Sequence, residues 1–354
     1  MRRYFTRLVG LNGIFCAIFG GLFALPLGRP EIGLAAGLGF GIVVGLLVEA
    51  IFWRWRGRWL YRRRLLALVL TEALLLLYVL LPGFIAYLNL RPARFPVTAI
   101  PAELADRAEV VSVTTRDGVS LSGWYIPPQN GAVLIALHGF GDNRLGVLPH
   151  ARMLTARGYG VLMMDMRAHG SSGGEIYADG WNTAGDVGAL AAYLQTRPEV
   201  EHIGALGLSA GAVAILRGGA ANDAIEAFIA DGTGVGAIED VFDPLLPHPA
   251  IAWLLVPDYW MSYRFTALFS GETLAPPLRE QVKRIAPRPI LFIAGAESMW
   301  EPELAARYVL SAGDSAEAWV IPNTGHIAGI LTHPDAYAGR VYTFLEHWLA
   351  GRSP

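Results

Sequence analysis

The stretch at residues 203–211 reads IGALGLSAG and decides the fold. Its first part is an apolar run, as expected for a strand that is covered on both faces of a sheet. The run ends in Gly207-Leu208-Ser209-Ala210-Gly211, and a small-residue segment able to form a helix follows at once. In this G-x-S-x-G pattern the glycines leave room for a strained turn that holds the serine hydroxyl at the carboxyl edge of the sheet. Ser209 is therefore the expected nucleophile, and a glycine-rich turn with an idle serine is the alternative.

Apolar runs of the same kind recur on both sides of this stretch and alternate with segments that could be helices, such as 182–195. An initial pair of runs is joined by a turn at Asp117 and Gly118, which predicts an antiparallel hairpin. The later runs predict a mostly parallel α/β sheet flanked by helices. In chain order the runs are EVVSVTT, VSLSGWYIP, AVLIALHG, VLMMD, IGALGLS, AFIAD, PILFIAG and AWVIP.

A serine nucleophile needs a general base and hydrogen-bond donors for the oxyanion. In this kind of fold the chain order is serine, acid, histidine. His326 follows the AWVIP run and is the expected base, with His333 as the spare. The oxyanion donors are expected to be the backbone N–H groups of Ala210 and of Phe140, which lies in the LHGFG turn after the AVLIALHG run. In that turn His138 is expected to have a structural role.

The acid that orients the histidine should follow the PILFIAG run, where the sequence continues as Ala296-Glu297-Ser298. Glu297 is the first choice, because a carboxylate behind the imidazole would stabilise its charged form. Asp231, which ends the AFIAD run, is the second choice, and Glu301 is the third.

Residues 110–349 resemble the α/β-hydrolase superfamily, in the branch of serine-aminopeptidase-like and dienelactone-hydrolase-like proteins. The resemblance implies a structural role for the turn at 165–170, and a lid formed by the insertion at 232–286, whose aromatic residues face substrate, face a membrane or pack the lid's own core. One departure concerns Ser298, which stands where that branch usually has the triad aspartate. The matching segments are DGVSLSGWYIP, LHGFGDNR, DMRAHGSS, GLSAG, the AG turn before Glu297 and GH at His326.

The N-terminal quarter is apolar enough for lipid, and the whole chain is 53% hydrophobic against 16% charged. Stretches at 8–27, 32–53 and 65–88 each reach the roughly 20 residues that a transmembrane helix needs. They predict a membrane domain at 1–88 with three spans. The loop WRWRGRWLYRRR at 53–64 is rich in arginine and is expected to be cytoplasmic. The N-terminus is then cytoplasmic too, and the hydrolase domain at 108–354 lies on the outer side of the cell membrane.

Small residues recur every fourth position in the first two expected spans. Such faces let helices approach closely, either within one chain or in a homodimer. The segment 89–107 contains three prolines and is expected to be an extended linker between the two domains. The small residues are Gly13, Ala17 and Gly21 in one span, and Gly33, Gly37, Gly41 and Gly45 in the other.

The sequence therefore predicts a membrane-anchored serine hydrolase that cleaves ester or acyl bonds through an acyl-enzyme on Ser209. A serine peptidase with the same triad is the first alternative, and a non-catalytic membrane-bound binding protein is the second. The expected partners are a small-molecule or lipid-like acyl substrate and membrane lipid. A net charge of −2 gives no reason to expect nucleic acid. No H-E-x-x-H pair or phosphate-binding loop occurs, so no metal or cofactor is expected.

Overall fold

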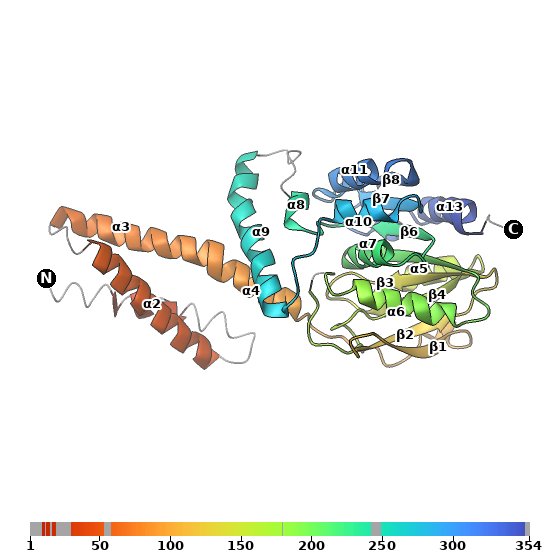
Figure 1. Ribbon diagram of the computed structural model, residues 1–354, viewed down its shortest axis with the longest axis horizontal. Coiled ribbons are helices and arrows are strands. Elements are labelled where there is room, and N and C mark those ends of the chain that lie inside the picture. The colour runs from red at the N-terminus through yellow and green to blue at the C-terminus, as the bar shows by residue number, and fades with distance from the viewer. Residues whose placement is uncertain are drawn as a thin grey trace. The chain divides into compact units, whose positions relative to one another are not determined.

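The structure, a computed structural model, describes residues 9–10, 12–14, 16–18, 30–52, 58–178, 180–241 and 249–350. The chain divides into two compact units, Met1–Ile85 and Ala86–Pro354. Figure 1 shows the elements with their labels. Most of the first expected span lies outside the described residues.

Helices that correspond to the second and third expected spans begin in the first unit, and the last of them continues into the second unit at Ala86. They are α2 (Pro30–Phe52), α3 (Arg58–Leu75), a π-helical turn (Leu76–Leu80) and α4 (Leu81–Leu90), the last three forming one continuous run. Proline has no N–H, so Pro82 cannot donate to the carbonyl four residues earlier, and the ladder shifts just before it. The N–H of Leu81 bonds to the carbonyl of Leu76 instead.

Among the described residues only Leu66–Leu90 is long and apolar enough to cross a membrane. Its mean hydropathy is 2.2. The apolar part of α2 is Gly37–Leu47, which at 1.5 Å per residue reaches about half of a ~30 Å hydrocarbon core. The expectation of three membrane-spanning helices is therefore not supported, and one candidate span remains.

The glycine face of α2 lies against the segment at 9–18 of the same chain. A Cβ on Gly37 would lie 2.0 Å from the carbonyl oxygen of Cys16, and one on Gly41 would lie 2.6 Å from that of Asn12. The Asn12 amide also donates to the Gly41 carbonyl at 2.7 Å. Gly37 and Gly41 are thus used within the chain, and the homodimer through the small-residue faces stays a prediction.

The second unit is built on an eight-stranded sheet with the order β1-β2-β4-β3-β5-β6-β7-β8. The opening hairpin has the predicted turn, since Gly118 adopts a left-handed φ of +83° and its N–H donates to Thr115. β2 pairs antiparallel with β4, and every later pairing is parallel. The strands are β1 (Glu109–Thr114), β2 (Ser120–Ile126), β3 (Ala132–Leu137), β4 (Gly160–Met164), β5 (His202–Leu208), β6 (Ala227–Asp231), β7 (Ile290–Gly295) and β8 (Ala316–Ile321).

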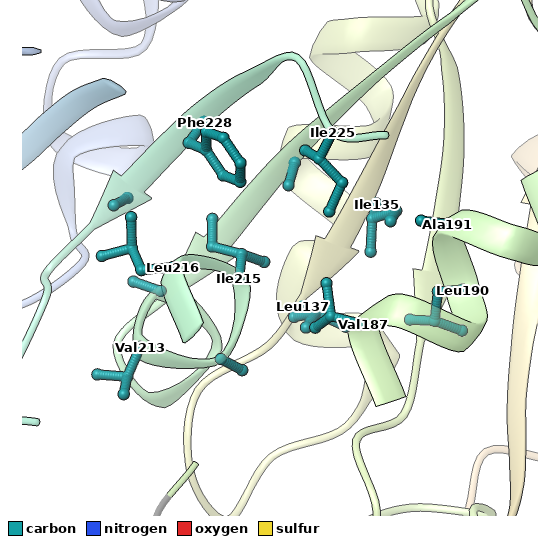
Figure 2. Close-up of a cluster of buried hydrophobic side chains, with 14 of the residues drawn as sticks. Ile135, Leu137, Val187, Leu190, Ala191, Val213, Ile215, Leu216, Ile225 and Phe228 are labelled. Atoms are coloured by element: carbon teal, nitrogen blue, oxygen red, sulfur yellow. The ribbon is translucent and has the colours of Figure 1, made fainter. Parts of the chain in front are cut away.

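Helices cover both faces of this sheet, which explains why the central strands are apolar along their whole length. One face is covered by α5 (Leu148–Thr155) and α13 (Pro334–Leu345). The other is covered by α6 (Ala184–Gln195), α7 (Ala210–Ala221), α10 (Leu278–Ile285) and α11 (Glu301–Ala312). Figure 2 shows side chains of α6 and α7, among them Val187 and Ile215, beside Ile135 of β3 and Phe228 of β6. The predicted mostly parallel α/β sheet flanked by helices is thereby confirmed.

The insertion between β6 and β7 contains two kinds of structure. α10 packs in the main core through Leu278, Val282 and Ile285, so it belongs to the sheet-covering layer. The remaining part carries α8 (Ile238–Val241) and the 22-residue helix α9 (Pro249–Ser270). Other short elements are 3₁₀ turns at Ala102–Leu104, Arg144–Val147 and Gly313–Ser315, α12 (Gly329–Thr332) and a π-helical turn at Glu346–Ala350.

The proline-containing segment 89–107 lies along the second unit. Leu90 and Leu104 are each 1% exposed. The Arg94 guanidinium donates to the carbonyl of Ser172, and the Asn143 amide donates to that of Phe95. The segment expected to be an extended linker is thus held by the hydrolase unit.

Candidate active site

Ser209 occupies a strained turn between β5 and α7. Its φ is +53° and its ψ is −112°, a combination that side chains other than glycine rarely adopt. A Cβ on Gly207 would lie 2.3 Å from the Gly211 carbonyl oxygen, and one on Gly211 would lie 2.4 Å from that of Leu137. Both glycines of the G-x-S-x-G pattern are therefore required by close backbone approach. The turn leaves the Ser209 hydroxyl at the carboxyl ends of the strands.

The structure brings His326 to Ser209, as the sequence suggested. The Nε2 atom of His326 lies 2.9 Å from the Ser209 Oγ. His326 follows β8, and its loop is tied to the turn after β7 by two backbone hydrogen bonds of 2.9 Å, from Ala296 to Ile321 and from Glu297 to Thr324. The imidazole side chain is 48% exposed, so a substrate can approach it.

Glu301 is the carboxylate behind the histidine. Its Oε1 accepts a hydrogen bond from the Nδ1 of His326, and its Oε2 accepts one of 3.0 Å from the Gly295 N–H. Ser298 donates to Oε1 through its hydroxyl. Glu301 is also the first residue of α11, where the helix dipole favours a negative charge. Ser209, His326 and Glu301 thus form one continuous hydrogen-bonded chain.

The pKa values of this pair favour an ionised carboxylate and a basic imidazole. Burial raises the pKa of Glu301, but hydrogen bonds from the imidazole, Ser298 and the Gly295 N–H outweigh it and hold the pKa below its usual value. The hydrogen bond to Glu301 raises the pKa of His326, against partial burial that lowers it. The carboxylate therefore fixes the Nδ1–H tautomer and leaves Nε2 free to accept a proton.

The position of Glu301 corrects the expected order of the acids. Glu297, the first choice, has an exposed side chain, and its backbone N–H is used to hold the histidine loop. Asp231, the second choice, is fully buried and accepts a hydrogen bond of 2.8 Å from the Tyr337 hydroxyl. Burial raises the pKa of Asp231 to about 7, against the hydrogen bond from Tyr337 that lowers it. Neither carboxylate bonds to His326 in the described part of the chain.

Glu301, the third choice from the sequence, lies further along the chain from β7 than Glu297 does. Trp300 adopts a left-handed φ of +73° and reverses the chain just before α11, which returns the next side chain toward β7. The signal available in the sequence was Glu301-Pro302, since proline is favoured in the first turn of a helix and an acid is favoured at its start. Ser298, which stands at the usual aspartate position, instead supports the acid by a hydrogen bond.

The turn after β3 lies beside Ser209, where oxyanion donors are needed. A Cβ on Gly139 would lie 3.6 Å from the Ser209 Cβ. Within the described ranges, the N–H groups of Phe140 and Ala210 donate to no other protein group. Phe140 and Ala210 thus each have an uncommitted backbone donor next in sequence to Gly139 and Ser209, and their role as oxyanion donors stays a prediction.

His138 shapes this turn and takes no part in the serine–histidine chain. Its Nδ1 donates to the Gly139 carbonyl at 2.7 Å, and its Nε2 accepts from the Met166 N–H at 3.1 Å. Burial lowers the pKa of His138, so the ring is neutral. His333, the spare base, lies 3.3 Å from the Thr324 hydroxyl through its Nδ1.

The turn after β4 braces the same region. Asp165 is fully buried and accepts hydrogen bonds from the Arg144 side chain at 2.7 and 3.1 Å and from the Ser171 N–H at 2.7 Å. Because the Met166 N–H also holds His138, this turn is connected to the turn that carries Phe140. The expected structural role of residues 165–170 is consistent with these contacts.

The arrangement can supply a nucleophile, a base, an orienting acid and two backbone donors, which are the groups required for acyl transfer through a covalent intermediate. Among the described residues no group of three or more metal-ligating side chains could hold a metal ion.

Two curated proteins are similar to this chain in sequence. The uncharacterized protein YfhR of Salmonella typhimurium is 27% identical over 253 residues, covering 68% of this chain and 78% of YfhR. The uncharacterized protein Rv2307c of Mycobacterium tuberculosis is 28% identical over 259 residues, covering 71% of this chain and 81% of Rv2307c.

Two solved structures are similar in fold. Esterase Pf2001 of Pyrococcus furiosus superposes with a TM-score of 0.59 at 26% identity and covers 74% of this chain and 99% of its own. Hydrolase GrgF of Penicillium sp. sh18 superposes with a TM-score of 0.55 at 20% identity and covers 69% and 99%. Residues 133–340, more than half of the chain, match the alpha/beta hydrolase family. The chain therefore belongs to the alpha/beta hydrolase family.

Proposed function

We propose that this chain is a serine esterase, anchored to the membrane, that cleaves carboxylic esters through an acyl-enzyme on Ser209. The observation that carries the proposal is the continuous chain from the Ser209 Oγ through His326 to Glu301, with the serine held in a strained elbow. The likeness to esterase Pf2001 over most of that protein supports ester cleavage.

The reaction starts when His326 Nε2 takes the proton from Ser209 Oγ as the oxygen attacks the ester carbonyl. The N–H groups of Phe140 and Ala210 stabilise the oxyanion that forms. His326 then gives the proton to the departing alcohol, and an acyl-enzyme remains on Ser209. Water attacks that acyl group with His326 again as base, which releases the acid and restores the serine. Glu301 holds Nδ1–H throughout and stabilises the charged imidazole.

Membrane anchoring is proposed through Leu66–Leu90. This is the candidate span in the described residues, and the arginines at 54–64 lie directly before it. Positive charge collects on the cytoplasmic side, so a single crossing after these arginines places the esterase unit on the outer side of the cell membrane. One span therefore gives the same orientation that was expected from three spans, with the hydrolase domain on the outer side.

The test is labelling of the detergent-solubilised full chain with a fluorophosphonate, which reacts with activated serines. Wild type is expected to label, Ser209→Ala to lose all labelling, and His326→Ala to lose nearly all of it. Ser112→Ala, at an exposed serine of β1, is the matched control and is expected to label like wild type. Labelling that persists in Ser209→Ala would overturn the assignment of the nucleophile.

Substrate class is tested with p-nitrophenyl esters against aminoacyl p-nitroanilides. Turnover of the esters with none of the anilides supports the esterase. Turnover of anilides at a similar rate would support the peptidase instead. Inertness of folded wild type toward both, without fluorophosphonate labelling, would support a non-catalytic binding protein.

A further inference from the structure

Helix α9 has an inner side that packs on other residues of the second unit. Ser262, Tyr263 and Thr266 of α9 line a solvent-open pocket together with Leu90 and Tyr177. Thr266 is buried, and the Tyr263 ring stacks on Trp181 with 5.6 Å between centroids. The inner side of α9 is therefore packed against the hydrolase core.

The pocket is connected to the proposed oxyanion turn through aromatic contacts. The Tyr177 ring lies 5.8 Å from that of Phe140 and 5.0 Å from that of His169. Phe140 is itself 44% exposed. Phe140, which carries one of the proposed oxyanion donors, is thus linked to α9 by packed aromatic side chains, through Tyr177 beside Tyr263.

The outer side of α9 is exposed and apolar. Trp260, Arg264 and Leu268 are spaced four residues apart and share one helix face. Leu268 is 70% exposed, and the Arg264 guanidinium lies over the Trp260 ring at 4.9 Å. On a helical wheel this face is roughly opposite the pocket-lining residues. Exposure of apolar side chains to water is unfavourable, so this face favours contact with a lipid or protein surface.

A third side of α9 touches the outer end of the candidate span. Phe269 makes an edge contact with Tyr87 at 6.4 Å, and Phe265 stacks on Phe269 at 5.5 Å. Tyr87 belongs to the last turn of Leu66–Leu90, and the Arg91 guanidinium lies over its ring at 4.4 Å. Tyr87, Arg91 and the α9 residues that touch Tyr87 all belong to the second unit. Aromatic rings and arginine gather at headgroup level, which favours that level for this group of residues.

We propose that α9 lies in the headgroup region of the bilayer and that the ester substrate is taken from the outer leaflet. This rests on the proposed function for the esterase step and for the anchor. The substrate class is an ester whose acyl chain resides in lipid, and the occupant of the face formed by Trp260, Arg264 and Leu268 is the lipid surface. Continuity of that face with the span end, through Phe269 and Tyr87, selects lipid over a protein partner.

The depth of α9 in the bilayer is measured on the full chain, which is reconstituted in vesicles of phosphatidylcholine and phosphatidylglycerol. In a Cys16→Ser background, which removes the chain's single cysteine, a fluorophore is attached at Leu268→Cys. Controls are Leu310→Cys on α11 and Leu331→Cys on α12, whose native leucines are 81% and 73% exposed. Lipids with nitroxide-labelled chains are expected to quench the label at 268 at least threefold more strongly than the control labels. Equal quenching at all three positions would overturn the proposal.

Substrate entry is measured by the ratio of two turnover rates, for a long-chain ester embedded in the same vesicles and for soluble p-nitrophenyl acetate. Leu268→Glu is expected to lower this ratio at least tenfold, while Leu310→Glu leaves it unchanged. An unchanged ratio in Leu268→Glu would overturn entry from the leaflet. Quenching does not depend on turnover, so an inactive wild type with strong quenching at 268 would contradict only the esterase.

Discussion

The carboxylate of Glu301 sets the chemistry of His326 at the scale of single residues. Replacing it by glutamine keeps the shape but removes the charge that orients the imidazole and stabilises its protonated form. We expect Glu301→Gln to lower kcat by about 10³–10⁴-fold, the size of effect seen when a triad acid becomes an amide. Turnover of p-nitrophenyl butyrate in detergent is the measurement.

Glu297→Gln is the matched control, because it makes the same change four residues earlier on an exposed side chain. It is expected to stay within about twofold of wild type, as surface substitutions usually do. If Glu297→Gln proved the more damaging of the two, Glu301 would not be the orienting acid.

The pH dependence follows from the raised pKa of His326. The base must be neutral to accept the serine proton, so activity falls as pH drops through the pKa of this group. Because the hydrogen bond to Glu301 stabilises the protonated imidazole, half-maximal kcat/KM is expected above the ordinary value of about 6.5. In Glu301→Gln this stabilisation of the protonated imidazole is lost, so half-maximal kcat/KM should be reached at a lower pH than in wild type. Profiles of kcat/KM against pH test this, and an unmoved midpoint in the variant would contradict it.

Ser209 and His326 could be identified from the sequence because each is tied to a strand end with a fixed local pattern. The glycines around Ser209 are needed for backbone clearance, and Gly325-His326 follows a short apolar strand. The acid could not be identified in the same way. Its position depends on the left-handed backbone of Trp300 and on the reach of a longer side chain, and local residue patterns encode neither strongly.

The elbow is a packing unit at the scale of elements, since α7 starts directly against the end of β3. A methyl group on Gly211 would lie 2.4 and 2.6 Å from the carbonyl oxygens of Leu137 and His138. Relief of this overlap would require a shift of the backbone, which costs free energy. We expect Gly211→Ala to destabilise the fold by about 1–3 kcal/mol, the usual cost of overpacking, and to abolish fluorophosphonate labelling. Thermal melting in detergent and gel fluorescence measure the two effects.

Gly339→Ala in α13 is the opposite case. A Cβ there would meet nothing within 4 Å, so the substitution is expected to stabilise the protein by about 0.5–1 kcal/mol through helix propensity. Labelling should be retained. A similar loss of stability in both alanine variants would mean that clearance at the elbow is not the cause.

Strands of the hydrolase unit were predictable because burial on both faces leaves long apolar runs, and each expected run has a corresponding strand. The insertion was less predictable. Its amphipathic helix α10 carries Leu278, Val282 and Ile285 into the main core, whereas α9 keeps an exposed apolar side. Apolar content alone does not distinguish a helix that packs on the sheet from one with another partner.

At the scale of the whole molecule the prediction concerns membrane topology. With arginines at 54–64 before the candidate span, the hydrolase unit is expected outside the cytoplasm. In the Cys16→Ser background, Leu310→Cys should react with a membrane-impermeant maleimide in intact bacterial spheroplasts. A cysteine in place of Arg56 in the preceding loop is the matched control and should react only after the membrane is permeabilised. The reverse pattern would place the esterase unit in the cytoplasm.

The two hydrogen bonds that join the turn after β7 to the histidine loop have a consequence for local opening. Glu301 is supported by that turn through Gly295 and Ser298, and His326 is supported by the loop to which Ala296 and Glu297 donate. Acid and base therefore lie on two segments that are joined by the same pair of backbone hydrogen bonds. The amides of Ala296 and Glu297 should exchange with deuterium only when these two bonds break. Their protection therefore reports how often the protein separates Glu301 from His326.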